Sequence, residues 1–142
     1  MLQITPQQMQ ALDNQGAARL DAHMVQTVGD ALPDLLRDQT PDRRRQQLAA
    51  WVEKGCERAL DMGFEQEHDL AAFVTLQLAH TLMSAKDQEK LREWAGDPLQ
   101  RKGSSGQVRM ALVESTLARL APTEPLADRL HGILGRVRAA YA

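Results

Sequence analysis

The chain has 142 residues, of which 43% are hydrophobic and 25% are charged, and its formal net charge at pH 7 is -2. A chain of this length is expected to form one domain with its own core, and the composition is that of an ordinary soluble globular protein. No acidic or basic tail offers itself to nucleic acid or to anionic lipid.

The only cysteine, Cys56, excludes an internal disulfide and indicates a reducing compartment. The opening stretch MLQITPQQMQAL lacks the basic region and the apolar run of about 7 to 15 residues that a secretory signal needs. Gln3, Thr5 and Pro6 interrupt its apolar residues almost at once. A cytoplasmic location without membrane contact is therefore expected.

The same stretch predicts the start of a first helix, which spans about residues 6–31. Thr5 is the expected N-cap, Pro6 the first helical residue, and Gln8 would complete a capping box. Apolar residues then recur mostly at multiples of four, and Pro33 is expected to stop the helix.

A second helix is expected to begin at Thr40-Pro41, again a cap followed by proline, and to end at Gly63 in the left-handed conformation. Phe64 would then fold back over the last turn. The residues expected to face inward are Leu48, Trp51, Val52, Ala59 and Leu60.

The third segment, residues 67–83, is the most apolar and covers more than one face, which predicts the central helix. Ser84 and Asp87 are expected to cap a charged fourth helix that runs to Trp94. Gly96-Asp97-Pro98 is expected to terminate that helix.

Ser104 and Gln107 predict a capping box for a fifth helix. A last helix follows Pro125, with an apolar stripe formed by Leu126, Leu130, Ile133, Leu134, Val137 and Tyr141. No segment alternates apolar and polar residues as strands do. The predicted fold is all-α, a single-domain bundle of five to six helices over residues 1–142.

Residues for catalysis or metal binding are not grouped in the sequence. The four histidines lie on four different predicted helices, and none has a second nitrogen or sulfur ligand one turn away: His23, His68, His80 and His131. The acidic cluster at 65–69 is explained by helix capping, and Cys56 by a structural thiol. No phosphate-binding loop or nucleophile elbow occurs, so we expect neither an enzyme nor a cofactor or metal.

Two features suggest a protein partner. Trp94 ends a charged helix and is either an interface anchor or a core residue. On the last helix, the small or short side chains opposite the apolar stripe would let a partner helix, from another protein or a second copy, approach closely, with two arginines at the margins to pair with acidic groups. These residues are Asp128, Gly132, Gly135 and Ala139, with Arg136 and Arg138 at the margins.

The only run of like charge, Arg43-Arg44-Arg45, is either a solvated face or a contact to phosphate. A small regulator that binds nucleic acid is therefore an alternative function. We expect no nucleic acid as the main partner, because the protein is slightly acidic overall.

A resemblance lies in the first 80 residues or so. It is carried by Ile4-x-x-x-Gln8-Met9-x-x-Leu12, His23-Met24-Val25, Arg58-Ala59 before Gly63-Phe64, and Asp69-Leu70-x-x-Phe73. These positions resemble small helical proteins encoded beside type VI secretion spike, PAAR and effector genes in proteobacteria. Ala79-His80 departs from the pattern, in which glycine commonly closes the third helix, and the region after Lys86 has no counterpart.

The resemblance implies a bacterial, cytoplasmic accessory, an adaptor or chaperone-like protein that helps to load or hold a secreted effector. It implies no catalytic residue. A cytoplasmic immunity or inhibitor protein is the other alternative.

Overall fold

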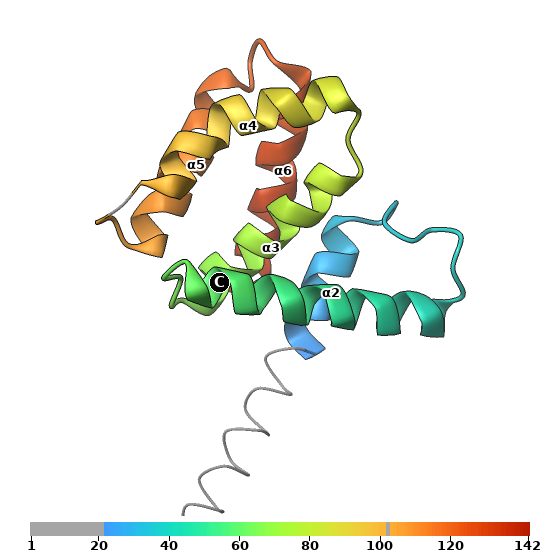
Figure 1. Ribbon diagram of the computed structural model, residues 1–142. Coiled ribbons are helices and arrows are strands. Elements are labelled where there is room, and N and C mark those ends of the chain that lie inside the picture. Colours follow the sequence, from blue (N-terminus) through green and yellow to red (C-terminus); the bar gives the residue numbers. More distant parts are fainter. Residues whose placement is uncertain (1–21, 102) are drawn as a thin grey trace, which may run out of the picture.

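The computed structural model describes residues 22–101 and 103–142 (Figure 1). Within these ranges the backbone is helical at 22–31 and in five longer helices, and no strand occurs. The five are α2 (Pro41–Asp61), α3 (Glu67–Thr81), α4 (Ala85–Gln100), α5 (Gly106–Leu120) and α6 (Pro125–Ala140). The prediction of an all-α bundle of five to six helices is confirmed. The expected start of the first helix at Thr5 and Pro6 lies outside the described residues.

Three predicted helix boundaries are confirmed. The Thr40 hydroxyl accepts a hydrogen bond from the Arg43 backbone N–H at 3.3 Å, which caps the start of α2. Gly63 follows the end of α2 with a φ of 91°, a conformation that favours glycine. The Ser84 hydroxyl accepts from the Asp87 backbone N–H at 3.3 Å and caps α4.

The predicted end of α4 at Gly96-Asp97-Pro98 is wrong, because the helix continues to Gln100. Proline removes one backbone donor, and its cost is highest in a helix interior. Pro98 lies in the last turn of α4, where little helix remains to be disrupted. Burial of Ala95 and Leu99 against the core favours the continuation.

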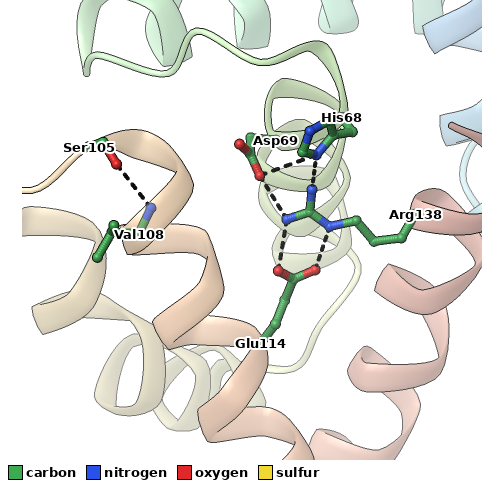
Figure 2. A network of polar contacts seen from close by, with 6 residues as sticks. All are labelled: His68, Asp69, Ser105, Val108, Glu114 and Arg138. Atoms are coloured by element: carbon green, nitrogen blue, oxygen red, sulfur yellow. Dashed lines mark hydrogen bonds and ion pairs between the residues drawn. The ribbon is translucent and has the colours of Figure 1, made fainter. Parts of the chain in front are cut away.

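The predicted cap of α5 is wrong by one residue. The hydroxyl of Ser105, not of Ser104, accepts from the Val108 backbone N–H at 3.2 Å (Figure 2). Gly106 is the first helical residue and lies against Phe64, where an added Cβ would come within 2.7 Å of the Phe64 Cα. This close approach places Gly106 inside the helix and leaves Ser105 as its cap.

α3 is the central helix, as predicted, and lies among α2, α5 and α6 with a smaller contact to α4 (Figure 1). Nine of its fifteen residues are buried: Asp69, Ala71, Ala72, Phe73, Val74, Thr75, Leu76, Leu78 and Ala79. In α2, Leu48, Val52 and Ala59 are buried as expected. Leu60 is 56% exposed, so its predicted inward orientation is wrong; Ala59 occupies the inner position of that turn.

Two arginines hold helix ends together through backbone carbonyls, which lack helical partners in the last turn. Arg44 donates to the carbonyls of Leu35 at 2.8 Å, Gly29 at 3.0 Å and Leu32 at 3.1 Å, and so fastens the end of helix 22–31 to α2. Arg44 is therefore not part of a solvated basic face.

Arg109, at the start of α5, makes the second set of such contacts. It donates to the Leu99 carbonyl at 2.9 Å and to the Met62 carbonyl, and its guanidinium lies 5.0 Å from the centre of the Phe64 ring. These bonds join the ends of α2 and α4 to α5.

Among the helices of the described residues, none is long and apolar enough to cross a membrane.

The end of α6 contacts helix 22–31 through an aromatic pair. The rings of Tyr141 and His23 meet edge to face, with centroids 4.7 Å apart. Burial raises the pKa of Tyr141 to about 12, and the nearby Glu67 carboxylate adds to the shift. The phenol is thus held in its neutral form by the folded protein.

We predict that replacing Gly106 with alanine destabilises the fold by about 1–3 kcal/mol, because the new Cβ would overlap the Phe64 backbone. Gly132→Ala is the matched control: nothing lies within 4 Å of its Cβ position in the middle of α6, so the change should stabilise by up to about 1 kcal/mol. Urea unfolding measures both. An unchanged midpoint for Gly106→Ala would contradict the close packing of α5 on Phe64.

We also predict that tyrosinate absorbance, which reports Tyr141 alone because the chain has one tyrosine, rises near pH 12 in the folded protein. In denaturant the midpoint should fall to about 10. Since the unfolded chain loses this proton first, the free energy of unfolding should decrease as pH rises from about 10 to about 12. A folded-state midpoint near 10 would contradict the burial of the phenol.

Candidate functional site

A groove with a cavity volume of about 560 Å³ lies among α2, α3 and α4. It exists because α2 packs on α3, α3 meets α4 over a short contact, and α2 and α4 do not pack along their lengths. The space between the outer two helices is left open above α3. A volume of this size is typical of ligand-binding clefts.

The floor and lower walls of the groove are apolar. Phe73 and Leu76 of α3 and Leu91 of α4 are buried, and the half-buried Trp51 of α2 borders them. Removing such surface from water supplies most of the free energy of association between nonpolar groups. The groove therefore offers an apolar ligand a favourable site.

The upper walls of the groove are positively charged. Lys54 and Arg58 of α2 and Arg92 of α4 are exposed lining residues, and none of them forms an ion pair with another described residue. No aspartate or glutamate is among the described residues that line the groove. The whole chain has 19 acidic and 17 basic residues, so this concentration of positive charge is local. It favours an anionic group on whatever binds.

His80 also lines the groove. Its Nε2 atom is shielded from solvent and makes no hydrogen bond with any other described residue. A buried polar atom without a partner is costly to the fold, and this one is not presented to the groove. The remaining polar lining residues are Gln77 and Thr81.

The residues predicted to bind a partner through α6 lie where the sequence placed them. Asp128, Gly132, Gly135, Arg136 and Ala139 are all exposed. A Cβ added at either glycine would meet nothing within 4 Å. Docking of a partner on this face stays a prediction.

Trp94 lies on α4, apart from the α6 residues, and is half-buried against the hydrophobic core. The sequence left open whether Trp94 is core or interface, and the structure gives it a packing role. Trp51, which the sequence assigned to the core, is the tryptophan that lines the groove.

Arg138, expected at the margin of the α6 face for pairing with a partner, is instead engaged within the chain (Figure 2). Its guanidinium forms two hydrogen bonds of 2.8 Å with the Glu114 carboxylate and lies 2.8 Å from the Asp69 Oδ1 atom. It also contacts the His68 Nδ1 atom. Hydrogen bonding of the Arg138 guanidinium to the Glu114 carboxylate is the main cause that raises the pKa of Arg138, while burial opposes the rise.

Asp69 is 1% exposed, and Arg138 is the cation that accompanies this buried carboxylate. Capping of α3, which the sequence suggested for the whole acidic cluster, does not explain Asp69. Its partner is supplied by α6, 69 positions along the chain, and no local pattern indicates that pair.

Cys56 is half-buried, with its sulfur 3.2 Å from the Met24 sulfur, in agreement with a packing role.

Within the described residues no three histidine, cysteine, aspartate or glutamate side chains are grouped to hold a metal ion. Comparison with protein-family models, with curated proteins and with solved structures finds no match for this chain. The resemblance of its N-terminal half to type VI secretion accessories therefore stays a prediction.

One feature of the sequence indicates the groove. The third segment is apolar on more than one face, yet the fourth offers only Leu91 and Trp94 as large apolar residues. A helix that is apolar all round needs cover on every side. Too little cover from α4 predicts an open apolar strip on α3.

We predict that Arg138→Met destabilises the fold by about 3–5 kcal/mol, because it leaves the Asp69 carboxylate buried without a cation. Arg136→Met is the control: Arg136 is exposed on the same helix, and its loss should change stability by less than about 0.5 kcal/mol. Urea unfolding of both variants, and of Arg138→Met combined with Asp69→Asn, measures the free energy of unfolding. If Asp69→Asn restores none of the stability lost in Arg138→Met, the unpaired Asp69 carboxylate is not the source of the destabilisation.

Proposed function

We propose that this chain is a non-catalytic, cytoplasmic protein-binding accessory, an adaptor or chaperone-like protein, and that the groove among α2, α3 and α4 holds a segment of its partner. The observation that carries the proposal is the combination of an apolar floor with unpaired cations on the walls. Trp51, Arg58 and Arg92 are of the residue types that contribute most to protein interfaces.

The lining of the groove supports binding over catalysis. Nucleophilic and acid–base mechanisms need a nucleophile and a base within hydrogen-bond reach, with a further group that orients the base. His80 is the one histidine among the described lining residues, and neither a carboxylate nor a cysteine lies beside it there. The polar atoms present suit recognition of a bound group.

The resemblance of the N-terminal half supplies the partner class to test first, a secreted effector or a component of the type VI secretion spike. An immunity or inhibitor role would use the same groove, and it differs in that binding would block a toxin's activity. For nucleic acid, the basic run at 43–45 has only two exposed arginines, because Arg44 is bonded to backbone carbonyls.

We predict that the double variant Arg58→Glu/Arg92→Glu loses at least about tenfold of its partner in affinity purification from native cells, since both cations would become repulsive carboxylates. The control Arg43→Glu/Arg45→Glu makes the same charge change at exposed positions outside the groove lining and should retain the partner. Quantitative mass spectrometry of the captured proteins measures both.

A third variant tests the other candidate surface. Gly132→Leu/Gly135→Leu adds bulk to the exposed face of α6 where space is open, so the fold should persist. If this variant loses the partner while the groove variant keeps it, the docking surface is α6 and the groove proposal is wrong.

A further inference from the structure

The charge of the groove restricts what can occupy it. Lys54, Arg58 and Arg92 contribute three positive charges, and no described lining residue contributes a negative one. Elsewhere in the described chain, Lys90 lies 3.4 Å from Glu124 and Arg37 contacts Asp34, whereas exposed arginines such as Arg43, Arg45 and Arg136 form no ion pair either. What distinguishes the groove is that three cations and no acid border one apolar space. The acids that would neutralise the groove are thus to be expected on the bound molecule.

The cations are divided between two walls. Lys54 and Arg58 belong to α2, and Arg92 belongs to α4, with the apolar side chains of α3 beneath. A segment with carboxylates on both flanks and apolar groups between them would reach both walls.

The backbone of the occupant gives a second restriction. The groove is walled by helices, whose own backbone groups are already paired. Among the described lining residues, the uncharged side chains with polar atoms are Trp51, Gln77, His80 and Thr81. An extended peptide in this groove would leave its N–H and C=O groups without partners, which is costly in an apolar site. A helix satisfies its own backbone and presents an apolar face, as in other helix-in-groove complexes.

The dimensions fit a short helix. The lining residues of α2 run from Trp51 to Arg58 and those of α4 from Leu91 to Leu99, which at 1.5 Å per residue is about 10–12 Å, or two helical turns. Gln77 and Thr81 line the same groove and can bond a polar side chain of the occupant.

We infer that the groove binds an acidic amphipathic helix of the partner protein. Its apolar side chains, spaced three and four residues apart, would contact the half-buried Trp51 and Leu99 above the buried floor of the groove. Carboxylates on its flanks would pair with Arg58 and Arg92. The inference rests on the proposed function and adds the chemistry of the segment that the partner contributes.

A synthetic peptide tests the inference with the full-length protein. The probe is a blocked helical peptide of about 14 residues with leucines on one face and glutamates on both flanks, titrated calorimetrically. We expect it to bind the parent and the Arg43→Glu/Arg45→Glu control alike, and to bind Arg58→Glu/Arg92→Glu about tenfold or more weakly. The same peptide with lysine for glutamate should fail on the parent and bind the charge-reversed variant.

Four binding results would overturn the inference, and a fifth result concerns dimerisation. They are absence of binding by the acidic peptide, equal binding to the charge-reversed variant, equal binding of a proline-interrupted peptide that cannot be helical, and a fatty-acid carboxylate that binds with the same dependence on both arginines. A concentration-dependent dimer of the protein that the charge reversal abolishes would identify a second copy as the occupant and would equally refute it.

The outcome for the proposed function is separate. If a partner is captured in cells through Arg58 and Arg92 while the acidic peptide does not bind, the protein-binding function stands and the acidic-helix chemistry is wrong. If capture is also independent of both arginines, the proposed function itself is wrong. Circular dichroism of each variant confirms that a loss of binding is not a loss of fold.

Discussion

The burial of α3 is the constraint on which the rest of the structure depends. Nine of its fifteen residues are buried and point in several directions, so the helix cannot lie on a surface and must be surrounded. α2, α5 and α6 enclose much of it, and their apolar faces are used in doing so. α4 buries only Leu91 and Ala95. The groove lies between this weakly apolar helix and α2, above buried side chains of α3.

Two sets of basic side chains have different roles in the structure. Arg44, Arg109 and Arg138 bond carbonyl ends or buried carboxylates and join elements that are distant in sequence. The planar guanidinium with its five donors suits this task, since one side chain can satisfy several acceptors at once. Lys54 and Arg92, which line the groove, form no ion pair with any described residue. Contacts within the described chain do not neutralise these charges, which are therefore available to the partner proposed above.

The features that could be predicted from the sequence are those decided within a few residues. Three helix boundaries depend on atoms only three or four positions away: the cap at Thr40, the left-handed Gly63 and the cap at Ser84. Local sequence therefore predicts them. The cap of α5 was misplaced because Phe64, distant in sequence, determines where Gly106 must lie. The ion pair of Asp69 with Arg138 depends on how separate helices pack, and so does the groove. A single sequence without an alignment gives little information on which helices pack together.

Gly55 restricts which parts of the groove can change between related proteins. A Cβ at this position would lie 2.9 Å from a methyl carbon of Val74, so the axes of α2 and α3 approach as closely as a glycine permits. At this point the Val74 side chain packs directly on the glycine, and an added methyl group would require Val74 or the helices to shift. The walls carry exposed side chains that can be exchanged at little cost in stability. Related proteins built on this frame would be free to change ligand preference through charge at the walls while the floor keeps its shape.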